Sequence, residues 1–490
     1  MKRILAAVVP AVLAASAIIP YLLDLGYGAA EAEVLLTGLG VAVLFGALGL
    51  LLRNVRRIHA LLPALLVYWT VDAYFATNSY MFLMTLLGAA VLYAGLITRF
   101  AENLRPMLLT FGILWLASNV LTPRPSLIDP PLVAHLEGGD RRLPPVVHFI
   151  IDEQMSPAAL PATIPPSHPA AAILGDYLGR GFDVHEHARS VSHLSRESIG
   201  NLVSLMDDSQ NFVLTRGKFS YHTKDNRYFA ALAARGYRII ALQSTYFALC
   251  TDDTQASCHD YSRAGHGKVI AKRLDSIPAR VGFAISELHH RMNHEEPSVN
   301  VLLYRMAMFG LRRLGLPFDS PESYSRPAAT LAILDEMTTQ LDAIQPGHAY
   351  VYHLLLPHTP YNLDSECRIK PPAEWTRGIG DRLHVFPIEK IYAGYWDQAA
   401  CTHTRMMEII DRVIASDAGR NAIIMVHGDH GARLTWEGAK EQDPADMLET
   451  FLAIRAPGTS GKALSEQVTL QHAFKDAVVR DIGLTLPTVP

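Results

Sequence analysis

Five apolar stretches lie within the first quarter of this 490-residue chain, and they restrict what its N-terminal part can fold into. The length of each is close to that of a helix that crosses a lipid bilayer, which needs about 20 residues. The stretches are Ile4–Leu25, Val34–Leu52, Ala60–Ala76, Met81–Ile97 and Met107–Leu121. We predict an N-terminal membrane domain of about five helices over residues 1–122. Four helices are the alternative, because the third and fifth stretches are short or partly polar.

The first stretch has a second interpretation. Lys2 and Arg3 form a basic start, and the segment Ala14–Ala17 resembles a signal-peptidase cleavage site. We expect an uncleaved helix instead, because further apolar stretches follow directly. Asp72 is the clear acid inside a stretch, and it is either functional or a residue of the membrane interface.

Basic residues between the stretches indicate an orientation. They precede the first stretch and follow the second and the fourth: Lys2, Arg3, Arg53, Arg56, Arg57, Arg99 and Arg105. Cytoplasmic loops carry an excess of such residues, so the N-terminus is expected in the cytoplasm and the chain after the fifth stretch outside. The pattern predicts a multi-pass membrane protein with a large C-terminal domain on the far side. That side is the periplasm if the membrane is a bacterial inner membrane.

The four cysteines all lie beyond the apolar stretches, where an oxidising compartment would favour disulfides. Four cysteines allow three pairings. We favour Cys250 with Cys258 and Cys367 with Cys401, and free cysteines in the core are the alternative. The formal net charge of −4 argues against nucleic acid as a partner.

After a proline-rich linker, residues 123–145, aliphatic runs alternate with helical patterns over residues 146–490. Alternation of this kind is typical of an α/β domain with a mostly parallel central sheet. Strands are expected at Val146–Ile151, Tyr237–Leu242, His348–Leu355, Ala422–Val426 and Phe451–Ile454. Helices are expected at Ala170–Leu178, Ser195–Leu205, Arg227–Arg235, Ser325–Ala343 and Tyr392–Ala415.

Two of these aliphatic runs end in potential metal ligands. Asp152 and Glu153 follow one run, and Asp429 and His430 follow another. In parallel sheets ligands bind outside the carboxyl ends of the strands, so these side chains are expected to meet. Buried acids at such positions are costly unless they bind a cation or donors. Capping of the next turn is the alternative role for Asp152.

Two further segments carry potentially reactive groups. Ser195 begins a predicted helix, where the positive end of the helix dipole favours an anionic phosphoryl group and a metal can activate the hydroxyl. Simple helix capping would explain it equally. His358 lies between Pro357 and Pro360 after a strand, so its ring is expected to be held rigidly.

These segments together resemble the alkaline phosphatase/sulfatase superfamily, and the whole chain resembles its membrane-anchored phosphoethanolamine and phosphoglycerol transferases. The family pattern begins with a strand that ends in a metal acid, matched by Ile150–Glu153. It continues with a nucleophile three residues before a serine, matched by Ser195–Ser198. A His-x-x-x-x-His-x-Pro element, matched by His353–Pro360, and an Asp-His-Gly, matched by Asp429–Gly431, complete it in order.

The chain departs from the family at three points. Ser195 stands where the transferases usually carry threonine, and Gly200 where proline is common. Ala432 follows Asp429–Gly431 where an acid is frequent. The sulfatase signature, Cys or Ser followed by x-Pro-x-Arg, does not occur around Ser195, which argues against a formylglycine sulfatase.

The resemblance implies roles for the site residues. The implied metal ligands are Asp152, Ser195, Asp429 and His430, with Glu153 assisting a second, substrate-recruited metal. Zinc is the expected ion and manganese the alternative. Ser195 would attack a phospholipid donor and pass the phospho group to an envelope glycan or lipid. His358 would bind phosphate or act as general acid, and His353, His358 and His427 would contact the substrate.

Other functions stay open at this stage. A membrane-tethered phosphodiesterase or phosphatase would give the intermediate to water, and a non-catalytic envelope-assembly protein would need no metal. Ser192 and Ser198 are the alternative nucleophiles. The segment Lys268–Pro321 carries no recognisable motif, although a second metal site or a solvated helix face is conceivable at Glu287, His289, His290 and His294.

Overall fold

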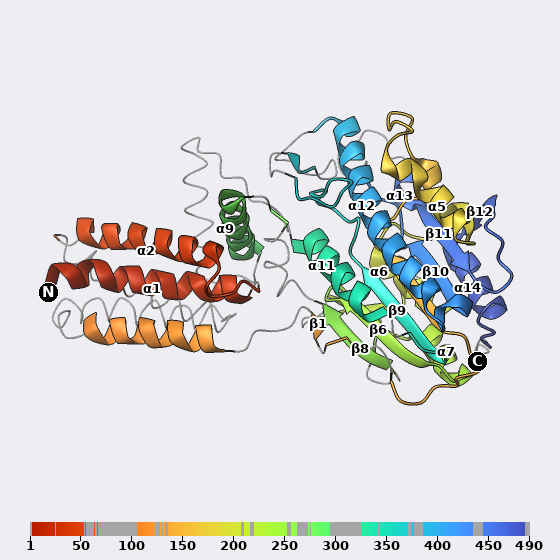
Figure 1. Ribbon diagram of the computed structural model, residues 1–490, viewed down its shortest axis with the longest axis horizontal. Helices are drawn as coiled ribbons and strands as arrows, with labels where there is room; N and C mark the ends of the chain where they lie inside the picture. The colour runs from red at the N-terminus through yellow and green to blue at the C-terminus, as the bar shows by residue number, and fades with distance from the viewer. Residues whose placement is uncertain are drawn as a thin grey trace. The chain divides into compact units, whose positions relative to one another are not determined.

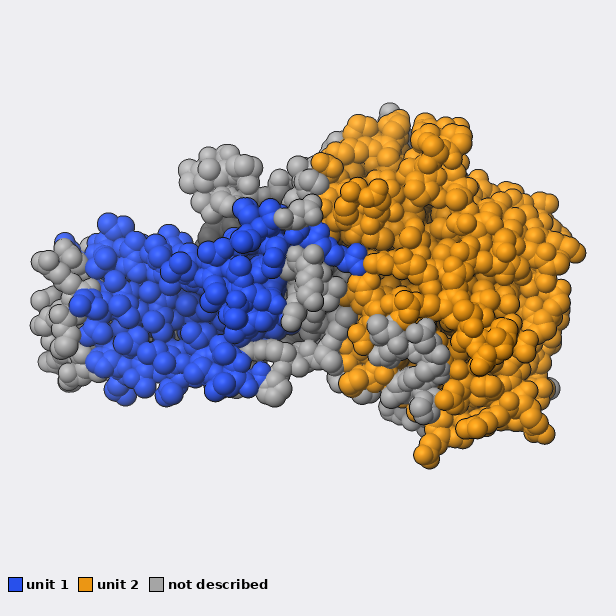
Figure 2. Space-filling view, viewed as in Figure 1, with its two compact units in different colours: residues 1–125, 264–324 blue, residues 126–263, 325–490 orange. Residues whose placement is uncertain are grey.

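The computed structural model of this chain divides into two compact units, residues 1–125 with 264–324 and residues 126–263 with 325–490 (Figure 2). The residues described are 2–24, 26–52, 105–122, 136–206, 210–215, 220–251, 256–261, 276–294, 325–341, 344–370, 386–434 and 444–485, with isolated positions between these ranges.

The first unit is helical. Helices α1 (Lys2–Asp24) and α2 (Ala32–Leu52) lie side by side (Figure 1). They approach closely at Gly49, where any side chain would meet the backbone carbonyl of Ala6. Two segments, Ile4–Asp24 and Ala32–Leu52, are long and apolar enough to cross a membrane, and Arg105–Leu121 is a shorter apolar helix.

The predicted membrane domain is therefore supported only in part. The first, second and fifth apolar stretches are helical, and two of them have the length of a span. Apart from Pro63 and Leu66, the third and fourth stretches, with Asp72, lie outside the described residues. Among the described residues, two helices have the length and hydropathy of a membrane span, where the sequence indicates about five spans.

Helix α9 (Ile277–His294) belongs to this first unit, although the sequence predicts it within the C-terminal domain. Ala284 of α9 packs in an apolar cluster with Ile18 and Val34. Arg280 forms an ion pair with the buried carboxylate of Glu33 on α2. These contacts correct the predicted boundaries, which placed residues 146–490 in a single domain. The side chains of Glu287, His289, His290 and His294 lie outside the described set.

The second unit is built on a nine-stranded sheet. Its five central strands run parallel in the order β8-β6-β9-β2-β10, and β11 pairs antiparallel with both β10 and β3. The strands, in sheet order, are β1 (Ile128–Asp129), β8 (Ala256–Tyr261), β6 (Arg238–Ser244), β9 (His348–Leu354), β2 (Val146–Ile151), β10 (Ile423–Gly428), β11 (Glu449–Arg455), β3 (Asp183–Arg189) and β12 (Ala463–Thr469). A small separate sheet contains β4 (Phe212–Leu214), β5 (Tyr221–Thr223) and β7 (Phe247–Ala248).

Helices cover both faces of the large sheet (Figure 1). Val147, Phe149 and Ile151 of β2 pack with α5 (Ile173–Gly179), α11 (Ser325–Gln340) and α12 (Ile388–Ala415). Val146 and Ile150 point to the other face, which packs with α6 (Ser195–Ser204), α7 (Arg227–Arg235) and α14 (Leu470–Arg480). The remaining short elements are α13 (Pro444–Leu448) and 3₁₀ turns at Pro157–Ala159, Pro169–Ala172 and Gly419–Asn421.

This architecture confirms the predicted α/β domain with a mostly parallel sheet. Both favoured disulfides are present, Cys250 with Cys258 and Cys367 with Cys401, so all four cysteines are paired. Strands β3 and β12 were not predicted, because their sequences, DVHEHAR and ALSEQVT, lack the aliphatic runs of buried strands.

Candidate metal and nucleophile site

The site forms where three neighbouring parallel strands end together. Ile151 of β2 lies opposite Leu354 of β9 and Gly428 of β10, so the residues that follow these strands emerge at one edge of the sheet. Asp152 follows β2 directly, and Asp429 follows β10. The common register therefore brings together residues that are far apart in the sequence.

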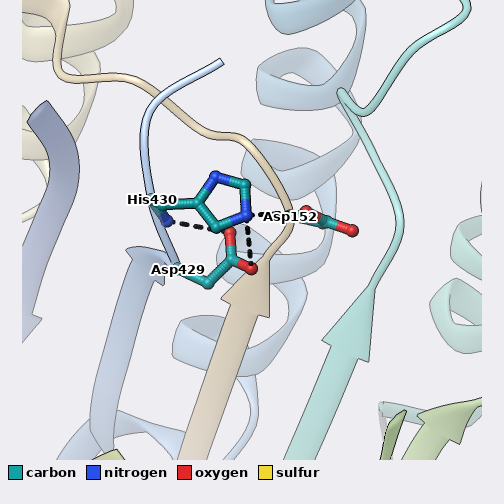
Figure 3. Close-up of side chains that lie close together, drawn as sticks. All are labelled: Asp152, Asp429 and His430. Carbon is teal, nitrogen blue, oxygen red and sulfur yellow. Dashed lines mark hydrogen bonds and ion pairs between the residues drawn. The ribbon is translucent and has the colours of Figure 1, made fainter. Parts of the chain in front are cut away.

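Asp152, Asp429 and His430 form a buried cluster that can hold a metal (Figure 3). Their candidate ligand atoms all lie within 4.8 Å of one another. The Nε2 atom of His430 is 3.3 Å from Oδ2 of Asp429 and 3.9 Å from Oδ1 of Asp152. All three side chains are at most 2% exposed. Two carboxylates buried this deeply need a cation nearby.

Hydrogen bonds orient these ligands. The Nδ1–H of His430 donates to the carbonyl of Gly431 at 2.7 Å, which leaves the Nε2 lone pair facing the cluster. Oδ1 of Asp429 accepts from the backbone N–H groups of Glu153 and His430 at 3.0 and 2.9 Å. Its Oδ2 atom is buried and accepts no hydrogen bond from the described residues. The donor set and this unsatisfied oxygen fit a divalent metal.

The Ser195 hydroxyl lies against the cluster. Ser195 is the first residue of α6, and its Oγ atom is 3.0 Å from Nε2 of His430 and 3.5 Å from Oδ1 of Asp152. The alternative serines are engaged elsewhere. Ser192 donates to the Glu197 carboxylate at 2.7 Å, and Ser198 donates to the backbone carbonyl of Asp429 at 2.6 Å. Of the three hydroxyls, only that of Ser195 faces the predicted ligands.

Glu153 and His358 form a second group beside the first. His358 Nε2 is 3.6 Å from Oε1 of Glu153, and the backbone N–H of Thr359 donates to Oε2 at 3.3 Å. Arg433 pairs with the same carboxylate through Nε, at 3.1 Å, and Nη2. Burial alone would raise the pKa of Glu153, but His358, Arg433 and His430 outweigh it and hold that pKa below its usual value.

Arg433 is the member of this site that sequence reasoning missed. Burial acts to lower the pKa of its guanidinium, but the Glu153 carboxylate outweighs this and raises it. The only sequence signal was a lone arginine two residues after Gly431, and nothing in the pattern linked it to Glu153. Gly431 lets the segment that leads to Arg433 pass close to the backbone of Asp446. A side chain at position 431 would clash with that backbone.

The structure does not bring His427 to the site, which corrects its prediction as a substrate contact. His427 shares the face of β10 occupied by Ile423 and Met425, because side chains alternate along a strand. Its Nε2 atom is 2.8 Å from Nε2 of His148, and its Nδ1–H donates to the carbonyl of Gly428. Its ring packs against Phe474 of α14.

His353 is also withdrawn from solvent. It is fully buried within β9, and its Nδ1 atom lies 3.5 Å from the Ser244 hydroxyl. Burial lowers the pKa of His353 to about 4, although the nearby Asp429 opposes the shift. As the structure stands, a substrate arriving from solvent would meet His358 and not His353.

No protein-family model matches the chain, and no curated protein sequence matches it. Solved structures do match it in part. The phosphonate monoester hydrolase of Agrobacterium radiobacter is 15% identical over 70% of this chain and 74% of its own, with a TM-score of 0.42. SpPMH, the phosphonate monoester hydrolase from Silicibacter pomeroyi, is 17% identical over 70% and 74%, with a TM-score of 0.41. The C-terminal periplasmic domain of EcEptC from Escherichia coli is 14% identical over 73% and 87%, with a TM-score of 0.37.

Proposed function

We propose that this chain is a membrane-anchored, metal-dependent enzyme of the alkaline phosphatase superfamily that transfers a phospho group through Ser195. The observation that carries the proposal is the contact of the Ser195 hydroxyl with His430 and Asp152, at 3.0 and 3.5 Å, inside a buried cluster of two carboxylates and an imidazole. A hydroxyl placed among hard metal ligands is suited to nucleophilic attack on phosphorus.

Asp152, Ser195, Asp429 and His430 would hold the metal, for which we propose zinc, with manganese as the alternative. When bound, such an ion would lower the pKa of the Ser195 hydroxyl and offset the negative charge that develops on the phosphoryl oxygens. The buried Oδ2 of Asp429 and the Nε2 atom of His430, whose lone pair faces the cluster, support this ligand set.

The transfer would proceed in two balanced steps. In the first, Ser195 Oγ loses its proton to solvent and bonds to the phosphorus of a phosphoethanolamine or phosphoglycerol lipid, while the bond from phosphorus to the diacylglycerol oxygen breaks. His358, whose Nδ1–H is held by the Thr359 carbonyl at 2.7 Å, would donate the Nε2 proton to that leaving oxygen. In the second, a hydroxyl of an envelope glycan or lipid gives its proton to Nε2 of His358 and bonds to phosphorus. The bond from phosphorus to Ser195 Oγ breaks, and Oγ regains a proton from solvent.

The setting supports a lipid donor. Two N-terminal helices have the length and hydropathy of membrane spans, and two disulfides suit an oxidising compartment such as the periplasm. We propose a multi-pass anchor in a bacterial inner membrane, with residues 126–263 and 325–490 outside the cytoplasm. Such an anchor would hold Ser195 where phospholipid head groups are presented.

The test is mass spectrometry of the full-length protein after incubation with phosphatidylethanolamine or phosphatidylglycerol and no acceptor. We expect a head-group phosphate adduct on the peptide that contains Ser195, and none in Ser195→Ala. Hydrolysis of the adduct in the absence of an acceptor would indicate that the protein is a phosphodiesterase. A protein with neither adduct nor bound metal would instead support a non-catalytic role in the envelope.

A further inference from the structure

The carboxylate of Glu153 lies where a second metal would need it. Ligand atoms of Asp152, Glu153 and His358 come within 4.8 Å of one another, which is close enough for one ion. However, Glu153 already has a cationic partner. Both Nε and Nη2 of Arg433 contact its Oε1 atom, so the guanidinium occupies the side of the carboxylate that an ion would use.

The backbone at both partners indicates that this contact is built into the fold. Glu153 has φ 63° and Arg433 has φ 56°, which is the left-handed region that residues other than glycine rarely adopt. Such conformations persist where the surrounding structure over-determines them. The Tyr395 hydroxyl, which bonds the carbonyl of Glu153 at 2.8 Å, is one such constraint.

Charge balance favours one ion. The site contains three buried carboxylates, those of Asp152, Glu153 and Asp429. The guanidinium of Arg433 and a single divalent ion would neutralise them together. A second divalent ion would have to displace Arg433 from Glu153 and remain beside its positive charge, at a large electrostatic cost in a buried site.

The solvent-facing side of the site is cationic. The side chains of His358 and Arg433 are 13% and 15% exposed, whereas those of Glu153, Asp429 and His430 are at most 1% exposed. A substrate would therefore meet an imidazole and a guanidinium first. The planar fork of N–H groups on arginine matches the oxygens of a phosphate.

We propose that Arg433 takes the place of a second metal: the centre holds one divalent ion, and Arg433 binds a non-bridging oxygen of the substrate's phospho group beside His358. The ligand class, a phosphate monoester or diester, rests on the proposed function. The one-metal centre rests on the contacts of Glu153 and on the charge balance of the site, and not on the proposed function.

The first test is the number of Zn²⁺ ions that remain bound to full-length protein in detergent, measured by plasma mass spectrometry after removal of free metal. We expect one ion per chain in the wild type and in Arg433→Lys, which keeps the positive charge. Arg433→His would add an imidazole to Glu153 and His358, and we expect it to bind two. Two ions in the wild type, or no gain in Arg433→His, would overturn the proposal.

The second test is binding of inorganic phosphate by calorimetry to the zinc-loaded protein. Removal of Arg433 alone would leave Glu153 buried and unpaired, so the variant is the double change Arg433→Gln with Glu153→Gln. We expect one zinc per chain and phosphate affinity about tenfold weaker, in keeping with the loss of a charge-assisted contact. Unchanged affinity would refute the role of Arg433. Neither test needs turnover, so a missing adduct on Ser195 would contradict the proposed function without affecting this result.

Discussion

Tyr395 and Gln398 lie three residues apart on α12, and their side chains fix the two loops that carry the site. The Tyr395 hydroxyl accepts from the backbone N–H of Met155 and donates to the carbonyl of Glu153, both at 2.8 Å. It therefore satisfies two backbone groups in the loop that begins with Asp152. Residues three apart on a helix share a face, so one surface of α12 serves both loops.

Gln398 does the same for the loop of His358. Its Oε1 atom accepts from the N–H groups of Asn362 and Leu363 at 3.0 and 3.2 Å. Its Nε2 atom lies within hydrogen-bond distance of three carbonyls, those of Pro357, His358 and Pro360. One fully buried amide thus replaces the pairing that a regular strand or helix would give this segment.

The first prediction concerns Tyr395→Phe. The change leaves the buried N–H of Met155 and carbonyl of Glu153 without their partner, and we expect a loss of about 1–3 kcal/mol in the free energy of unfolding. Because Glu153 and Asp152 share this loop, activity should fall as well. Denaturant unfolding and turnover assays of the same preparation measure the two effects.

Tyr350→Phe is the matched control. The Tyr350 hydroxyl also accepts from a backbone N–H, that of the half-buried Gln345 at 3.0 Å, but it lies in β9 away from the carboxyl ends of the strands. We expect a comparable loss of stability with activity unchanged. Equal activity losses in the two variants would show that Tyr395 acts through general stability and not through the loop.

The parts of the fold that the sequence predicted well are its buried strands. Val146–Ile151 is a strand with the predicted bounds, because a strand buried on both faces has an unbroken aliphatic run. The helix Arg227–Arg235 also agrees in full, since Asn226 caps its start and Gly236 ends it. The outer strands β3 and β12 were not predicted, because half-exposed strands mix polar and apolar residues.

The site was predictable as far as strand ends determine it. Asp152 and Asp429 met because parallel strands share a carboxyl edge. His427 was misplaced because it lies inside β10, on the face of Ile423 and Met425 that packs against α14, whereas Asp429 lies beyond the end of the strand. The pair of Glu153 and Arg433 was not predictable, because it depends on two left-handed turns 280 residues apart.

The second prediction separates the nucleophile from its neighbours. Ser195→Ala should reduce transfer by about a thousandfold or more, as removal of a nucleophile does in other enzymes, with little change in stability. Ser192→Ala removes a hydroxyl that bonds Glu197 instead, and we expect turnover within a few-fold of the wild type. Steady-state assays on both variants decide the assignment. Normal turnover in Ser195→Ala would make Ser192 the next candidate for the nucleophile.

The third prediction concerns the disulfides. Cys367–Cys401 ties the His358 loop to α12 and closes 34 residues, whereas Cys250–Cys258 closes only 8. In the chain-entropy treatment the longer loop contributes about 4 kcal/mol and the shorter about 2.5 kcal/mol. In denaturant unfolding, the Cys→Ser variant without Cys367–Cys401 should lose more stability than the variant without Cys250–Cys258. Activity should fall only when Cys367–Cys401 is removed, because the loop of His358 then loses its covalent tie to α12. The reverse order of stability would contradict the argument.

The fourth prediction concerns acid stability. Burial, together with His427, holds the pKa of His148 well below its usual value, and burial lowers that of His427 to about 4. The unfolded chain protonates both rings below pH about 6.5, where the folded chain does not. Proton binding therefore favours unfolding, and the stability that is present above pH about 6.5 is lost as the pH falls towards 4.

The double variant His148→Leu with His427→Leu removes both rings of this pair, so that neither is left with an unpaired nitrogen. Its free energy of unfolding should decrease less steeply between pH 6.5 and 4 than that of the wild type, whatever its value at pH 7. His472→Gln, an exposed position on α14, is the control and should keep the wild-type slope. Urea unfolding at several pH values gives the slopes directly. Parallel curves for the double variant and the wild type would mean that the buried pair is not what makes the fold sensitive to acid.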